Sequence, residues 1–152
     1  MDIQMKDLQP LINKHLGLPA GHVALLQDIQ NTYRYLPREA LEIAAKQLDI
    51  PMSQLYSMAT FYKSFNLQPR GVHDVHVCTG TACHVRGALR ILDRLSQVLG
   101  IAPGETTKDG TYTLETVNCV GACALGPLVT IDGQYHGQLT PVKAEKLLGR
   151  KP

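Results

Sequence analysis

Residues 72–99 read VHDVHVCTGTACHVRGALRILDRLSQVL, and they decide the fold of the chain. The first six alternate between apolar and polar side chains, which is typical of a strand with one buried face. From Val85 to Leu99 the apolar residues recur at helical spacing, through Leu89, Leu92 and Leu95. Two cysteines stand between these patterns. The stretch therefore predicts a strand, a loop that carries two thiols, and an amphipathic helix.

The sequence after this helix predicts more strands and one further helix. Residues 111–117 are rich in Thr and Tyr, which favour strands. Residues 128–131 and 134–136 predict a hairpin across Asp132-Gly133, a dipeptide suited to tight turns. A last helix is predicted over 142–148. The expected architecture of this half is a small α/β layer with a mixed sheet.

The sequence before the strand predicts helices. Apolar residues from Ile3 to about Phe65 recur with helical spacing. Gln68-Pro69-Arg70-Gly71 then forms a turn-rich stretch in which the pattern changes. We therefore predict a small helical docking domain at residues 1–66, a linker at 67–71 and an α/β domain at 72–152.

Composition and charge exclude several classes of function. A chain of 152 residues with 44% hydrophobic content can bury a core, and its formal net charge is only +2. Residues 1–66 carry six basic and six acidic side chains, which argues against reading residues 50–54 as the turn of a DNA-binding helix-turn-helix. The charged start of the chain and the lack of a stretch of about 18 apolar residues predict a cytoplasmic protein without membrane insertion.

The four cysteines form the strongest candidate site. They occur as Cys78-x4-Cys83 and Cys119-x3-Cys123, and each pair follows a predicted strand. Both loops can meet at one edge of a sheet, and their small residues let backbone N–H groups approach sulfur. In a reducing compartment four such thiols favour a metal site over disulfides. The spacing favours an iron-sulfur site without naming its family.

Other roles for the cysteines remain open at this point. Four thiolates also suit structural zinc, although the usual zinc spacings differ, and the chain would then be a zinc-stabilised adaptor that organises partners. Free cysteines can also pack in a core. A thiol-disulfide enzyme would need a Cys-x-x-Cys motif, which the chain lacks. Mixed ligation of a cluster by His76 or His84 is a further alternative, but four cysteines are already available.

Two residues near the cysteines carry open expectations. Arg86 follows Cys83 by three positions and suits either a charge that compensates a cluster or a solvated side chain, and the second is preferred. Pro127 follows the second pair of cysteines, and its peptide bond suits either a cis or a trans turn. Six of the eight aromatic residues lie in the helical half; most are expected in its core and the rest on a docking surface.

Four separated segments carry a family resemblance. CTGTACHVRGA at 78–88 and NCVGAC at 118–123, with YLPREAL at 35–41 and ATFYKSF at 59–65, resemble the thioredoxin-like [2Fe-2S] subunit of NADH dehydrogenases, the 24-kDa-type subunit of complex I and its relatives. The resemblance implies a thioredoxin-like [2Fe-2S] ferredoxin domain. By motif position it also implies one [2Fe-2S] cluster whose ligands are Cys78, Cys83, Cys119 and Cys123.

The resemblance further implies an electron-transfer subunit of a multisubunit NAD(H)-dependent oxidoreductase. Its partners would be a flavoprotein subunit that binds FMN and NADH and a larger iron-sulfur, hydrogenase or formate dehydrogenase subunit. The chain has no Gly-x-Gly-x-x-Gly loop, so no nucleotide site and no catalytic residue are expected on it. The first motif is similar to those of the soluble hydrogenase and formate dehydrogenase branch of the family, which includes electron-bifurcating enzymes. The alternatives are a subunit of complex I and a free ferredoxin-like electron shuttle.

Overall fold

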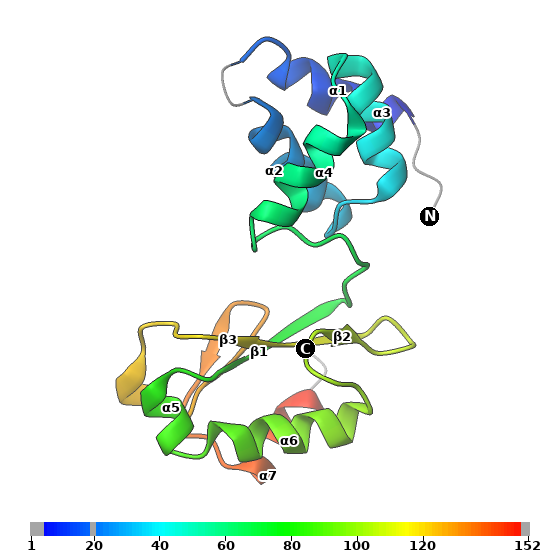
Figure 1. The fold of residues 1–152 in the computed structure, drawn as a ribbon. Helices are drawn as coiled ribbons and strands as arrows, with labels where there is room; N and C mark the ends of the chain where they lie inside the picture. The colour runs from blue at the N-terminus through cyan, green and yellow to red at the C-terminus, as the bar shows by residue number, and fades with distance from the viewer. Residues whose placement is uncertain (1–4, 19–20, 150–152) are drawn as a thin grey trace. The chain divides into compact units, whose positions relative to one another are not determined.

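The computed structural model describes residues 5–18 and 21–149 of the chain. The chain folds as two compact units, Met1–Pro69 and Arg70–Pro152, and each is described by itself (Figure 1). Arg70 and Gly71 belong to the second unit. The Arg70 Nε atom donates to Asp74 Oδ1 over 2.9 Å, and the Gly71 N–H donates to Thr113 Oγ1 over 2.7 Å. Within the described ranges, no helix is long and apolar enough to span a membrane.

The described residues of the first unit form a bundle of four short helices. They are α1 (Met5–His15), α2 (Gly21–Tyr33), α3 (Arg38–Leu48) and α4 (Met52–Phe61). Each described helix turns an apolar stripe inward, because residues three and four positions apart share a face. The largest fully buried side chains of this core are Leu8, Ile12, Leu25, Leu26, Ile29, Leu36, Leu41 and Leu55.

The second unit is a five-stranded mixed sheet with helices on one face (Figure 1). Its elements are β1 (His73–Cys78), α5 (Thr81–Val85), α6 (Ala88–Leu99), β2 (Glu105–Thr106), β3 (Tyr112–Val117), the 3-10 turn η1 (Cys123–Leu125), β4 (Val129–Ile131), β5 (Gln134–His136) and α7 (Pro141–Leu148). The strand order is β2-β3-β1-β4-β5. Val75, Val77 and Leu114 form the core with Ile91 and Leu95 of α6.

The pairing of β1 with β3 brings the two cysteine motifs together. The two strands are parallel, with Cys78 opposite Val117, while β4 pairs antiparallel to β1 on its other side. The crossover through α5 and α6 returns the chain to the edge of the sheet where β1 begins, so β3 runs parallel to β1 and both strands end at the same opposite edge. The loops that follow β1 and β3 therefore begin next to each other.

The predicted fold class is confirmed, with two local differences. The hairpin across Asp132-Gly133 is present between β4 and β5. The helix expected over 85–99 instead begins at Ala88, and a separate short helix, α5, ends at Val85; the φ of 95° at Gly87 interrupts the helical backbone between them. The short edge strand β2 was not predicted, because two residues are too few to show an alternating pattern.

Candidate metal centre

The first cysteine loop is anchored in the sheet. Cys78 is the last residue of β1, and its N–H donates to the carbonyl of Leu128 over 3.0 Å. The N–H and the hydroxyl of Thr79 both donate to the carbonyl of Val117, over 2.8 Å and 3.1 Å. Cys83 lies in α5, and both cysteines are only 2% exposed. This pair of thiols is part of the core.

The second cysteine loop lies at the surface. Cys119 follows β3 by two residues, Cys123 is the first residue of η1, and both are exposed. Gly121 has a φ of 81°, a backbone conformation that residues with a Cβ rarely adopt. The Gly121 N–H donates to Cys119 Sγ over 3.4 Å. The loop is thus shaped to direct a backbone donor at a thiol.

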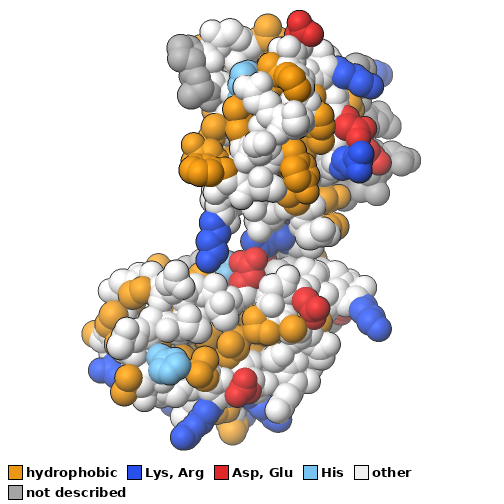
Figure 2. All heavy atoms as spheres, in the orientation of Figure 1, with side chains coloured by type: hydrophobic (Ala, Val, Ile, Leu, Met, Phe, Trp, Pro, Cys, Tyr) orange, Lys and Arg blue, Asp and Glu red, His pale blue; other side chains and the backbone are white. Residues whose placement is uncertain are grey.

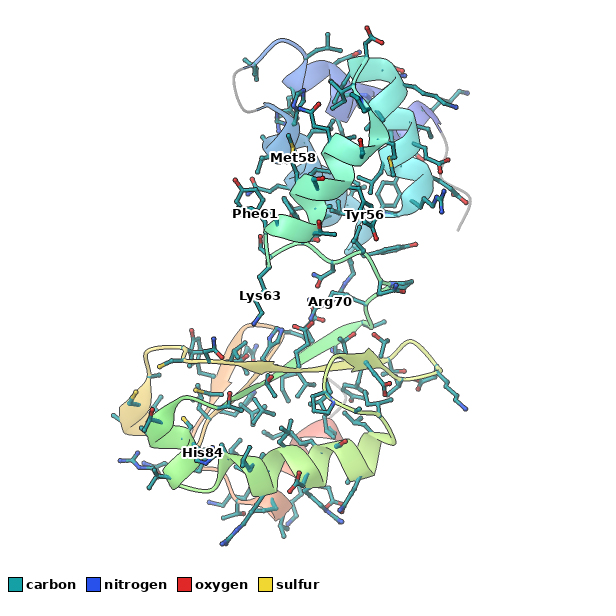
Figure 3. The ribbon with its side chains drawn as sticks, viewed as in Figure 1. Tyr56, Met58, Phe61, Lys63, Arg70 and His84 are labelled. Carbon is teal, nitrogen blue, oxygen red and sulfur yellow. The ribbon has the colours of Figure 1, made fainter. Side chains whose placement is uncertain are left out.

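Two glycines allow the loops to touch. A Cβ at Gly80 would lie 2.5 Å from the carbonyl oxygen of Asn118 and 3.2 Å from the Cβ of Cys119. A Cβ at Gly126 would lie 3.1 Å from Cys83 Sγ. A side chain at either position would push the loops apart. In Figure 3 the yellow sulfur atoms of this unit lie together beside α5.

The thiols interact closely enough to shift one another's pKa values. Burial alone raises the pKa of Cys78, but hydrogen bonds from the Val120 and Gly80 N–H groups, and from two neighbouring thiols, hold it below its ordinary value. Burial, followed by the hydrogen bond with Cys78, raises the pKa of Cys83. The hydrogen bond with Cys119 and the charge beside it raise the pKa of Cys123. All four thiols are therefore neighbours in one site.

The arrangement fits a cluster that is held by two pairs of thiolates. Within residues 5–18 and 21–149, no three His, Cys, Asp or Glu side chains converge on a position for a single metal ion. A [2Fe-2S] cluster needs four thiolates but divides them between two irons, so two adjoining pairs suffice. The backbone N–H groups of Gly80, Val120 and Gly121 add the donors that stabilise charge on cluster sulfur.

The two histidines near the motifs differ in their surroundings. His76 points to the sheet face opposite Val75, and its Nε2 lies 3.2 Å from Glu115 Oε2. Arg70 lies beside both, with its Nη2 atom 3.4 Å from His76 Nε2. His84 is exposed on α5, as Figure 3 shows.

The sequence did not reveal the role of Arg86. The preferred expectation was a solvated side chain, and the residue is indeed exposed. Its Nη1 atom, however, donates to the carbonyls of Cys123, over 2.9 Å, and Gly126, over 3.3 Å. The Gly126-Pro127 peptide bond is cis. The available signal for this contact was only the position of Arg86, three residues after Cys83.

Comparison with known proteins identifies relatives over most of the chain. The model of a family described as thioredoxin-like [2Fe-2S] ferredoxin matches residues 8–151. The chain is 36% identical over 129 residues to the HndA subunit of the NADP-reducing hydrogenase of Solidesulfovibrio fructosivorans, covering 84% of this chain and 75% of that one. It is 30% identical over 149 residues to an NADH-quinone oxidoreductase subunit of Aquifex aeolicus, covering 95% and 93%.

A solved structure supports the fold independently. An NAD+-reducing [NiFe]-hydrogenase in its air-oxidised state matches with a TM-score of 0.69 at 21% sequence identity. The match covers 82% of this chain but only 22% of the hydrogenase chain, so it concerns the fold of one part of that protein. Together with the family model, it confirms the expected thioredoxin-like architecture.

Proposed function

Because this chain belongs to the thioredoxin-like [2Fe-2S] ferredoxin family, we propose that Cys78, Cys83, Cys119 and Cys123 bind its one [2Fe-2S] cluster. We further propose that the chain is an electron-transfer subunit of an NAD(H)-dependent oxidoreductase complex. When bound, such a cluster takes up or gives away one electron at a time. One observation carries the proposal: two cysteine loops from parallel strands meet at one sheet edge, with all four thiols within interaction range.

The residues of the chain hold the site in a fixed geometry. The backbone of Cys78 is hydrogen-bonded to Leu128, directly before β4, and that of Thr79 to Val117 of β3, so the first loop is fixed from both sides. The N–H groups of Gly80, Val120 and Gly121 direct partial positive charge at sulfur. Hydrogen bonds to sulfur are among the features that set the potential of such a cluster. No step in this role requires a catalytic side chain on the chain itself.

The electron partners are proposed from the relatives and the absence of a nucleotide motif. The relatives are named as subunits of an NADP-reducing hydrogenase and of NADH-quinone oxidoreductases. Since the sequence has no Gly-x-Gly-x-x-Gly loop, we propose that a partner flavoprotein binds NADH and FMN and exchanges electrons with this chain. A larger iron-sulfur subunit would carry them onward. A soluble hydrogenase or formate dehydrogenase, with or without electron bifurcation, is the proposed parent, and complex I is the alternative.

We propose the helical unit as the docking domain and the segment 67–71 as its linker, the last two residues of which, Arg70 and Gly71, are bonded to the sheet unit. Its exposed aromatic residues support this role, because Phe61 is 80% exposed and Tyr56 is 50% exposed on α4 (Figure 3). Tyr62 packs edge-to-face on Phe61, with ring centroids 5.1 Å apart, and is 43% exposed. Figure 2 shows hydrophobic side chains in orange gathered on this face of the unit. Exposed apolar patches of this kind mark protein interfaces.

The test begins with the metal. Anaerobic purification followed by iron, sulfide and zinc analysis should give about two irons and two sulfides per chain. Low-temperature EPR of the dithionite-reduced protein should show one S = 1/2 signal. One zinc without such a signal would reject the cluster and support the zinc-stabilised adaptor. Replacing any one of the four cysteines with serine should reduce the iron content, whereas no other residue is expected to act as a ligand.

The second test concerns the partner. With the flavoprotein of the parent complex present, addition of NADH should produce the same EPR signal that dithionite produces. Phe61→Ala should weaken binding of the two chains while leaving the iron content unchanged, because Phe61 lies in the helical unit. Tight binding by the Phe61→Ala variant would argue against the docking surface but not against the cluster. Lys6→Ala, also in the helical unit but outside α4, is the matched control.

A further inference from the structure

We propose that Arg86 is a positioning residue for the cluster. Its guanidinium ties the helix that carries Cys83 to the loop that carries Cys123, and its positive charge favours the reduced form. This inference rests on the proposed function, because it assigns a role toward the same site. It concerns a residue that neither the spacing of the cysteines nor the family motif identifies as a ligand.

The first argument is geometric. Arg86 directly follows the last residue of α5, three positions after Cys83, and its Nη1 atom donates to the carbonyls of Cys123 and Gly126. These two bonds span the segment that contains η1. A Cβ built at Gly126 would lie 3.1 Å from Cys83 Sγ and 3.5 Å from Arg86 Nη1, so the guanidinium and this sulfur flank the same backbone position. One side chain thus connects both cysteine loops beside a ligand.

The second argument comes from two other arginines of this unit, Arg70 and Arg94. Arg70 contacts Asp74 and Glu115, and Arg94 binds Glu145 through two nitrogens, over 3.0 Å and 2.8 Å. The charge of each is thus balanced by a carboxylate. Arg86 instead donates to neutral carbonyls, and among the described residues no carboxylate lies within ion-pair distance of it. Its charge therefore remains available to the site.

The third argument is electrostatic. Four thiolates and a cluster carry net negative charge, which grows when one electron is added without any change in bonds. A cation within the Debye length of about 8 Å stabilises the more negative state. Arg86 is exposed, so solvent weakens this effect. We expect its removal to lower the equilibrium constant for reduction by about three- to tenfold, a shift of about 30–60 mV at about 59 mV per tenfold change.

Two variants of Arg86 separate its charge from its hydrogen bonds. Arg86→Gln removes the charge, and Arg86→Lys keeps the charge but lacks the planar guanidinium fork. Arg94→Gln, which makes the same change on α6, is the control. For each purified full-length protein, EPR-monitored titration gives the midpoint potential, and the rate of iron transfer to a chelator gives the retention of the cluster.

The expected result has three parts. Arg86→Gln should have a more negative midpoint potential than the wild type and lose iron faster. Arg86→Lys should keep nearly the original potential but also lose iron faster. Arg94→Gln should match the wild type in both midpoint potential and rate of iron release. A wild-type potential and release rate for Arg86→Gln would overturn the inference, as would an equal shift for Arg94→Gln. If Arg86→Gln does not assemble a cluster, the rate of iron release from Arg86→Lys is the test: faster release than from the wild type supports the inference, and an equal rate overturns it. Wild-type protein without iron would instead reject the proposed function itself.

Discussion

The two cysteine loops supply the same chemical group from opposite surroundings. Cys78 and Cys83 are buried, and the first of them ends the central strand of the sheet. Cys119 and Cys123 are exposed, on a loop and a single 3-10 turn. The first pair therefore contributes to the fold whether or not metal is bound. The second pair is not part of the core. Its position is determined by local turns and by contacts such as the hydrogen bond from Arg86 to the carbonyl of Cys123.

This difference implies that the site is half preformed. The first loop is held rigidly by the sheet. The second loop packs against it, because Gly80 has no Cβ to keep the loops apart and backbone N–H groups donate to Cys78. An electron partner would meet the exposed pair, while the buried pair faces the core. Changes in the first loop should consequently alter the fold and the cluster together, and changes in the second should alter mainly the cluster. The following predictions test that distinction.

The largest effect is expected for Gly80→Ala. The new Cβ would lie 2.5 Å from a backbone oxygen, that of Asn118, which cannot move away as a flexible side chain could. Forced packing of this kind costs about 1–3 kcal/mol, and this contact should lie at the upper end. We expect lower hydrogen-exchange protection of the β1 and β3 amides in the apo chain and little bound iron. Gly149→Ala, with no atom nearer than 3.9 Å, is the control and should change neither.

The cysteine pairs should respond differently to serine in the apo chain. Cys78→Ser and Cys83→Ser each bury a hydroxyl, which destabilises by about 1–2 kcal/mol where it finds no full set of partners. Cys119→Ser and Cys123→Ser should stay within about 0.5 kcal/mol of the wild type, since both sites are exposed. The measurement is the opening free energy from hydrogen exchange of the sheet unit. Equal losses in all four variants would remove the distinction between the loops.

A smaller effect is expected for Gly121→Ala. Space is open around this position, so only the left-handed backbone with φ of 81° opposes a side chain. That conformation costs about 1 kcal/mol for alanine. Because the strain is local to the second loop, we expect faster iron release with unchanged exchange in β1. A loss of hydrogen-exchange protection in β1 as large as that expected for Gly80→Ala would show that the second loop is not independent of the sheet.

The smallest effect is expected for Asp28→Asn in the helical unit. This unit has no cysteines and serves as a comparison for the sheet unit. Hydrogen bonds from Lys14 and then His15 lower the pKa of Asp28. A lowered pKa stabilises the folded state above the unfolded pKa of about 4, and this contribution is lost as pH falls through the folded pKa. Asp28→Asn should therefore flatten the acid dependence of exchange in α1 and α2, by less than about 1 kcal/mol. The pH dependence of hydrogen exchange in the sheet unit should be unchanged by this substitution.

The sequence predicted the elements of the sheet unit better than their contacts. Alternation over residues 72–77 and helical spacing over 85–99 predicted β1 and α6 to within three residues at each end, because each element is half-buried and regular. The break at Gly87 was missed, since one glycine also fits within a helix at some cost. The expectation that most of the six aromatic residues of the helical half lie in its core was wrong, because only Phe65 is buried. Three of the six are exposed, namely Tyr56, Phe61 and Tyr62.

The candidate site was predictable in its members but not in its asymmetry. Cysteine spacing, together with strands that precede both pairs, indicated that the thiols would meet. Which pair is buried depends on β1 being the central strand, and strand order is not visible in local patterns. The bonds from Arg86 to two carbonyls were hidden for a similar reason, because backbone acceptors have no sequence signal.

The parallel pairing of β1 with β3 also has a consequence for how the protein is made. Cys119 follows Cys83 by 36 residues, so a ribosome that adds about 5–20 residues per second exposes the first pair about 2–7 s before the second. For most of that interval β3 has not been synthesised, and throughout it β4 is missing, so β1 lacks neighbours in the sheet and its thiols are uncovered. Complete cluster insertion must therefore wait for synthesis of the second loop, which leaves the nascent chain open to oxidation during that interval.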